Sequence, residues 1–241
     1  MRSESEMRKW LQERRDLGIK FVFASFAGYG EVHDSWNGRT GDFDFLMNTS
    51  KIAGEMGMVF RQRLFLLKST LPTLERLIDR LDQLPGKVKS REIYPLSYSG
   101  RAGQLEEERV TDTDLDCLPE QVTKFFFKRA TWHTEGEWMD IISKEENSPV
   151  KVMLKLWLDD TNIERIEALS CEEIAAEMED RTRAAFAALP TRQELSKECG
   201  NVANTCLYQY SHDIERKWLD RYLAKYPLQF ERQLTYLSMF N

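Results

Sequence analysis

The sequence predicts an α+β protein. A mixed α/β N-terminal half leads into an antiparallel three-stranded meander at about 122–158, and a helical C-terminal third follows. Three observations predict this class. The apolar run at 21–26 is typical of a buried strand, and apolar and polar residues alternate over 150–158 as in a strand with one apolar face. Ser170 and Glu173 have the spacing of a capping box that opens a helix. The regions expected are 1–110 (mixed α/β), 111–160 (antiparallel sheet) and 161–241 (helical), packed as one compact domain or as two tightly packed ones.

The first elements can be placed from periodicity. Apolar residues recur at helical spacing over 4–16, and Gly18 ends that helix. The same segment is charged and has no long apolar stretch, so we expect no signal peptide. The first strand follows at 19–26, and 42–47 is a candidate for a second, short strand.

The middle of the chain is less regular. Residues 51–68 have helical periodicity, but two glycines within it weaken the helix, and the segment stays ambiguous. A clear amphipathic helix begins near Thr70 and ends at Pro85. Residues 87–98 are expected to be extended, and the acidic stretch 100–120 to be a loop or an internal boundary.

The predicted meander consists of three apolar segments joined by short links. Short connections between strands favour antiparallel pairing, because a parallel crossover needs a dozen or more residues. From Thr161 onward the pattern is helical, and prolines at 190 and 227 interrupt it. The three strands expected are Val122–Thr131, Glu137–Ser143 and Val150–Leu158.

Composition excludes some classes of function. The net charge of −6 and the pI of about 5.3 disfavour non-specific binding to nucleic acid, which needs clustered Lys and Arg. No apolar run approaches the ~18 residues that cross a bilayer, and the four cysteines form no CxxC pair. We therefore expect a cytoplasmic protein with reduced thiols and no membrane partner, and we consider nucleic acid an unlikely partner. The densest basic spots, interpreted as solvated surface, are Arg61, Arg63 and Lys68, and then Lys87, Lys89 and Arg91.

A glycine-rich turn after the first strand is the best candidate for a chemical site. If 42–47 is a strand, Asp42 and Asp44 point to the same side of it. The order Phe23-Ala-Ser25, Gly30-Glu31 and Asp42-Phe-Asp-Phe45 resembles polymerase-beta-type nucleotidyltransferases. That resemblance implies that both aspartates hold Mg²⁺ ions that bridge nucleotide phosphates. His33, beside Asp34, would be a candidate general base.

The alternative, which we prefer at this stage, is a surface loop whose aspartates cap, turn or face solvent. The leading hypothesis is then a non-catalytic cytosolic protein-interaction protein without a cofactor. It would be an accessory, inhibitor, immunity or assembly subunit of bacterial or phage type. The competing hypothesis is a Mg²⁺-dependent nucleotidyltransferase-like enzyme. Aromatic residues near the C-terminus would contact another protein or a second copy of the chain. These candidate partner-binding residues are Tyr222, Tyr226, Phe230, Tyr236 and Phe240.

Overall fold

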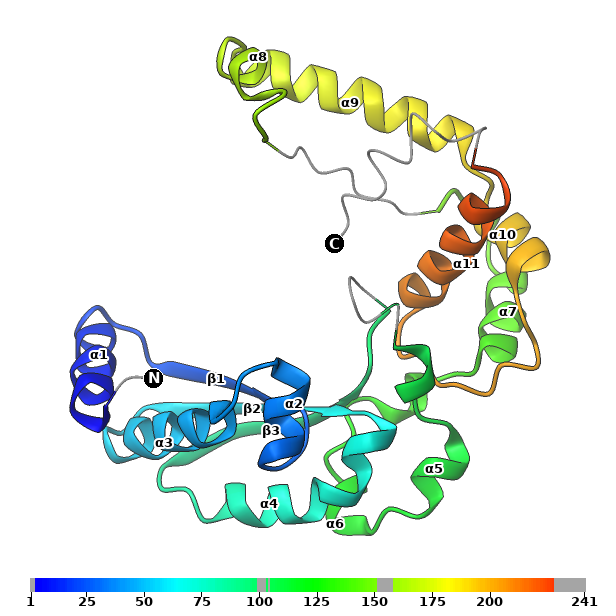
Figure 1. Ribbon diagram of the computed structural model, residues 1–241. Helices are drawn as coiled ribbons and strands as arrows, with labels where there is room; N and C mark the ends of the chain where they lie inside the picture. Colours follow the sequence, from blue (N-terminus) through cyan, green and yellow to red (C-terminus); the bar gives the residue numbers. More distant parts are fainter. Residues whose placement is uncertain (1–2, 99–102, 104, 151–157, 228–241) are drawn as a thin grey trace. The chain divides into compact units, whose positions relative to one another are not determined.

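The computed structural model describes residues 3–98, 103, 105–150 and 158–227 (Figure 1). The chain divides into two compact units, which we call unit 1 and unit 2. Unit 1 consists of Met1–Leu96 and Glu107–Thr131, and unit 2 of Ser97–Glu106 and Trp132–Asn241.

Unit 1 is built on a three-stranded sheet in which both strand pairs are parallel. Its strands are β1 (Phe21–Phe26), β2 (Val59–Leu66) and β3 (Lys87–Pro95), in the order β1-β2-β3. Each crossover moves one strand in the same direction, so right-handed connections place the intervening helices on one face. Figure 1 shows α3 (Asp42–Glu55) and α4 (Leu74–Asp82) on the same side of the sheet.

Apolar stripes on three helices form the core of unit 1. The stripe of α4, which includes Leu77 and Leu81, is fully buried. The first helix, α1 (Glu4–Asp16), buries Met7 and Leu11 in a cluster with residues of α3 and β2. A close backbone approach sets the position of α3, since a Cβ at Gly54 would lie 1.9 Å from the carbonyl oxygen of Pro85. Unit 1 also contains the short helices α2 (Glu31–Asn37), α5 (Asp112–Asp116) and α6 (Glu120–Thr123).

The predicted antiparallel meander is wrong, because the sheet is parallel and lies in the N-terminal half. The segment expected as its first strand contains part of α6 and a 3-10 turn at Arg129–Thr131. The second lies within α7 (Glu135–Lys144), where the Thr134 hydroxyl accepts from the Glu137 N–H in a capping box. This local start signal outweighs the apolar spacing that suggested a strand. Most of the third, residues 151–157, lies outside the described residues.

The expected strand at 42–47 is also wrong, because these residues open α3. The cap of α3 comes from a distant residue: the Asp34 carboxylate accepts from the N–H groups of Gly41 at 2.5 Å and Phe43 at 2.8 Å. Because this capping residue lies seven or more positions before the N–H groups that it accepts from, the sequence next to the start of α3 contains no capping motif. The ambiguous segment 51–68 divides between the end of α3 and all of β2.

Unit 2 is helical where the structure describes it. Its helices are α7, α8 (Ile163–Glu167), α9 (Cys171–Ala188), α10 (Arg192–Cys199) and α11 (Ser211–Lys225). Side chains from α7, α10 and α11 share one apolar core around the fully buried Trp218. Within the described part of the chain, no helix has the length and apolar character that crossing a bilayer requires.

Candidate functional site

The glycine turn lies at the carboxyl end of β1, the edge of a parallel sheet where ligands commonly bind. Gly28 and Gly30 have φ angles of 91° and 58°, which favour glycine. A Cβ at Gly28 would also lie 2.8 Å from Val32 Cγ1. The turn therefore needs these glycines for its own shape, and it leads directly into α2.

His33 is the buried centre of this region, with 1% of its surface exposed. The Ala27 N–H donates to His33 Nδ1 at 3.0 Å, so Nδ1 is an acceptor. Nε2 lies 2.8 Å from Asn37 Nδ2 and 3.3 Å from Asp42 Oδ2. Burial lowers the pKa of His33, against the opposing effect of Asp42. The ring is thus neutral and serves as a link between β1 and α3.

The remaining polar groups of the turn satisfy one another. Asn37 Nδ2 donates to Asp42 Oδ2 at 2.7 Å, and Arg39 forms an ion pair with Asp42 Oδ1 at 3.3 Å. Hydrogen bonds from the N–H groups of Phe43 and Gly41 lower the pKa of Asp34. The structure therefore brings His33 and Asp42 together in a bonded network that joins β1, α2 and α3.

Asp44 is not part of this network. It is exposed on α3, and two residues along a helix correspond to a rotation of roughly 200°, so Asp42 and Asp44 point in different directions. Within the described residues, no three His, Cys, Asp or Glu side chains are grouped in a way that could hold a metal ion.

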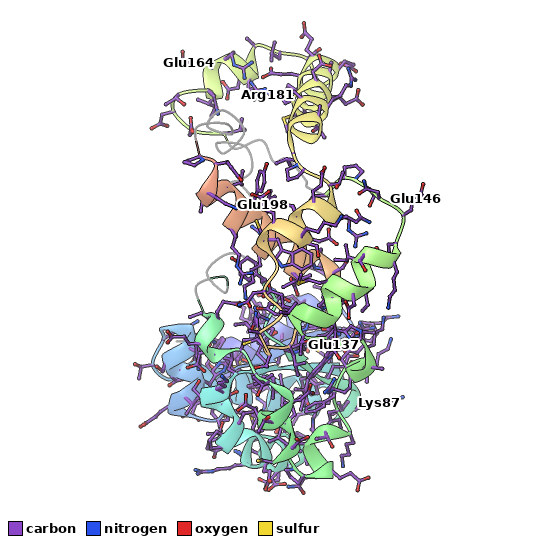
Figure 2. All side chains as sticks on the ribbon, turned by 90° about the vertical axis from the view of Figure 1, so that its right-hand side faces the viewer. Lys87, Glu137, Glu146, Glu164, Arg181 and Glu198 are labelled. Carbon is purple, nitrogen blue, oxygen red and sulfur yellow. The ribbon has the colours of Figure 1, made fainter. Side chains whose placement is uncertain are left out.

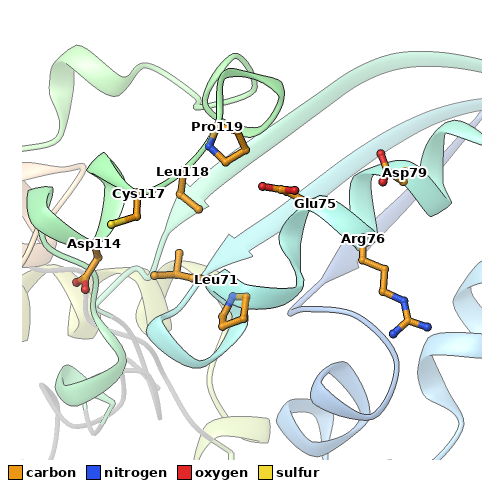
Figure 3. A pocket seen from close by; sticks show the side chains of 9 residues that line it. Leu71, Glu75, Arg76, Asp79, Asp114, Cys117, Leu118 and Pro119 are labelled. Carbon is orange, nitrogen blue, oxygen red and sulfur yellow. The ribbon is translucent and has the colours of Figure 1, made fainter.

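A surface pocket of about 600 Å³ lies elsewhere in unit 1, between α4 and the α5–α6 segment (Figure 3). Apolar side chains of Leu71 and Leu118 line it together with the carboxylates of Glu75 and Asp114. Asp114 already caps α5 through Thr111. Acidic and apolar side chains are mixed in the lining of this pocket, so the lining does not indicate one class of ligand.

The predicted partner-binding aromatics of the C-terminus are only partly described. Tyr222 and Tyr226 pack partly buried against the core of unit 2, with ring centroids 4.7 Å apart. The Tyr226 hydroxyl donates to Glu198, and this bond raises the pKa of Tyr226. Both rings are thus engaged within unit 2. The other three predicted residues, Phe230, Tyr236 and Phe240, lie outside the described residues.

The second face of the parallel sheet carries a different kind of surface. Parallel sheets are normally covered on both faces, yet Phe21 is 48% exposed and Phe23 52% exposed on β1. On β2 this face carries Arg61 and Arg63 between the apolar Val59 and Phe65, whereas the opposite face of β2 is buried. We call this surface the basic aromatic face. It consists of Phe21, Phe23, Arg61, Arg63, Lys89, Glu92, Tyr94 and Phe127.

Cations and rings alternate across this face. The Arg63 guanidinium carbon lies 5.0 Å from the ring centroid of Phe23 and 4.7 Å from that of Tyr94. In a neighbouring row, Arg61 lies 5.6 Å and the Lys89 ammonium 4.9 Å from the Phe21 centroid. These are the distances of cation–π contacts. The guanidinium group of Arg63 thus lies between the ring of Phe23 and the ring of Tyr94.

Two irregularities complete the arrangement. The β2–β3 register shifts after Phe60, so that Val88 and Ser90 have partners on β2 and Lys89 is the extra residue. Beyond β3, the Ile93 N–H donates to the Phe125 carbonyl at 2.8 Å, and the Phe127 N–H donates to the Ile93 carbonyl at 2.9 Å. This short bridge places the Phe127 ring 4.8 Å from Tyr94.

Among the described residues, Glu92 shares this face with Arg63, but its carboxylate accepts a hydrogen bond from Tyr94. Across the described residues, no carboxylate oxygen lies within 4.0 Å of the basic groups of Arg61, Arg63 or Lys89. Burial and a hydrogen bond to Glu92 raise the pKa of Tyr94 to about 12, so its phenol stays neutral. Lys87, at the start of β3, adds an exposed cation that projects from the surface (Figure 2).

The sequence pattern identifies these basic residues but does not show that they share a surface with Phe21 and Phe23. Arg61 and Arg63 alternate on β2, as Phe21 and Phe23 do on β1, and this shared period of two was the available signal. Comparison with protein-family models, with curated proteins and with solved structures finds no match.

Proposed function

We propose that this protein acts by binding, and that the basic aromatic face holds an anionic partner. The observation that carries the proposal is a sheet face with half-exposed Phe21 and Phe23 whose cations have no carboxylate partners among the described residues. Aromatic and arginine side chains dominate the energetics of binding surfaces. An anion placed here would satisfy the cations and cover the rings together.

The acidic total charge of the chain does not oppose this proposal. Local potential, rather than net charge, governs the approach of a ligand to one surface. The three strands carry five basic residues and one acidic residue, Glu92. Four of the basic residues, Arg61, Arg63, Lys87 and Lys89, are on the side of the basic aromatic face, as is Glu92. Arg91 is on the opposite face, where it donates to Gln62 and forms an ion pair with Asp82.

The proposal keeps the binding class that the sequence suggested and moves the binding surface to unit 1. A contact through Tyr222 and Tyr226, a protein partner and a cytoplasmic location stay predictions. The nucleotidyltransferase alternative also stays a prediction, and the placement of Asp42 and Asp44 on a helix adds no support to it.

The test uses inorganic polyphosphate as a plain anionic probe. Binding to the full chain is measured by calorimetry at about 50 and 200 mM salt, because phosphate contacts depend steeply on ionic strength. We expect the double variant R61Q/R63Q to bind about tenfold more weakly or worse. The control is R80Q/R183Q, which removes the same charge at two exposed arginines outside the face.

The expected result is that the control binds like the parent chain. Equal binding by R61Q/R63Q and the parent chain would overturn the proposal. So would the absence of any binding by the folded parent chain at the lower salt concentration.

A further inference from the structure

We infer that the anionic partner is a single strand of nucleic acid, whose bases stack on the rings of the basic aromatic face. This inference rests on the proposed function and adds the ligand's chemistry. Cations alone would suit any polyanion, but the rings of Phe21 and Phe23 are also presented to the ligand. A ligand that uses both must combine negative charge with flat π surfaces, and single-stranded nucleic acid does so at every nucleotide.

The geometry offers two stacking platforms with a basic row between them. Phe21 and Phe23 form one platform on β1, and Tyr94 with Phe127 forms the other on β3 and its edge. Adjacent strands are about 4.8 Å apart, so the platforms are separated by roughly 10 Å. Two bases stacked on the two platforms would come from nucleotides that are close to each other along one strand.

Arg63 is placed to hold the backbone that links such bases. Its guanidinium carbon lies 5.0 Å from the ring of Phe23 and 4.7 Å from that of Tyr94, so it borders both platforms. A guanidinium group binds phosphate through a planar fork of donors and also stacks on aromatic faces. Arg61 and Lys89 border the Phe21 ring in the same way.

The face does not suit a duplex. In a duplex the π surfaces of the bases are stacked on one another, and direct readout requires an element that enters a groove. The basic aromatic face consists of sheet residues, with the helices α3 and α4 on the other side of the sheet (Figure 1). Its rings would therefore gain nothing from double-stranded nucleic acid.

The experiment measures fluorescence anisotropy of labelled twelve-nucleotide oligouridylate and oligothymidylate, a duplex of the same length, and polyphosphate as competitor. The two single strands differ in sugar, and binding of either one supports the inference. The variant F21L/F23L keeps apolar bulk on β1 but removes the rings. Its matched control is F45L, because Phe45 also lies under a guanidinium group, that of Arg39 at 5.2 Å, but is on α3.

We expect single strands to bind more tightly than the duplex. F21L/F23L should weaken single-strand binding about tenfold or more while the salt dependence stays the same, since stacking involves no ion release. R61Q/R63Q should lower the salt slope by about 1.4, the value for two phosphate contacts on a single strand. F45L should bind like the parent chain. Circular dichroism of each variant confirms that it is folded.

The outcomes separate this inference from the proposed function. If F21L/F23L binds single strands like the parent chain while R61Q/R63Q does not, the face binds anions without stacking, and only the inference fails. If a duplex binds as tightly as a single strand, the inference fails and the proposed function stands. If the parent chain binds neither oligonucleotides nor polyphosphate, both proposals fail.

Discussion

The basic groups of unit 1 and unit 2 have opposite surroundings. In unit 1, Arg61 and Arg63 lie on a sheet face over aromatic rings, with no carboxylate in ion-pair distance among the described residues. In unit 2, Lys217 and Arg221 of α11 lie against the fully buried carboxylate of Glu135 on α7. Basic side chains therefore neutralise a buried carboxylate in unit 2, whereas in unit 1 they lie against aromatic rings.

The Glu135 carboxylate is compensated from several sides. It accepts hydrogen bonds from Trp218 Nε1 at 2.8 Å, Asn204 Nδ2 at 2.6 Å and Arg221 at 2.5 Å. Lys217 is only 7% exposed and forms ion pairs with both Glu135 and Glu106. A buried charge is tolerated only when it is paired and hydrogen-bonded in this way.

This comparison separates charges that hold the fold from charges that are available to a ligand. The ion pairs of Glu135 join α7 to α11, and they leave little capacity for an outside group. The cations of the basic aromatic face keep that capacity, because rings satisfy them only weakly. Three substitutions, from the largest expected effect to the smallest, test the distinction.

The largest effect is expected from Glu135→Ala. Removal of the carboxylate leaves Lys217 and Arg221 without their shared anion at a buried site, so unit 2 should lose about 3–5 kcal/mol of unfolding free energy. Urea denaturation followed by tryptophan fluorescence measures the loss, since Trp138 and Trp218 lie in this core. The control is Glu137→Ala on the same helix (Figure 2), which removes an exposed carboxylate of the capping box and should cost about 1 kcal/mol. Equal losses in the two variants would contradict the interpretation.

A smaller effect is expected from His33→Phe in unit 1. The change removes the acceptor of the Ala27 N–H and the partner of Asp42, leaving buried polar groups unpaired at a cost of about 1–3 kcal/mol. Burial lowers the pKa of His33 below its ordinary value of 6.5, so the unfolded chain binds the proton first. The stability of the parent chain should thus fall as the pH drops below 6.5, and His33→Phe should lack this part of the fall. If the free energy of unfolding depends on pH in the same way for both chains across that range, the interpretation of a neutral, buried ring is wrong.

The sequence predicted elements better than it predicted their pairing. The helix at 4–16, a strand within 19–26 and the amphipathic helix α4 are confirmed as elements, because each has a local signal. The expectation that this strand is buried is wrong, since Phe21 and Phe23 are half-exposed. β2 was ambiguous, since the glycines before it belong to the end of α3 and to the turn. Its parallel register, which sets Arg61 opposite Phe23, depends on partners tens of residues away.

The candidate site was hidden for the same physical reason. Arg61 and Arg63 could be interpreted as solvated surface as long as the neighbouring strands were unknown. Phe127 approaches Tyr94 through the short parallel bridge at Ile93, in a segment that the sequence assigned to an antiparallel meander. Surfaces that arise from non-local pairing cannot be predicted from spacing within one element.

The smallest effect on stability is expected from R61Q/R63Q. Arg61 and Arg63 make three cation–π contacts. Such contacts contribute about 0.5–1 kcal/mol each, and glutamine keeps part of the packing, so the double variant should lose about 1–2 kcal/mol. The matched comparison is Arg192→Gln in unit 2. In the parent chain Arg192 forms an ion pair with the buried Glu215 at 2.7 Å, and the substitution leaves this carboxylate without that cation. That single change should cost more than the double change, as measured by urea denaturation. A larger loss from R61Q/R63Q would mean that the arginines hold the sheet together, and any loss of binding could then be a loss of fold. A small loss of stability combined with a large loss of binding is the result that places these arginines with the ligand.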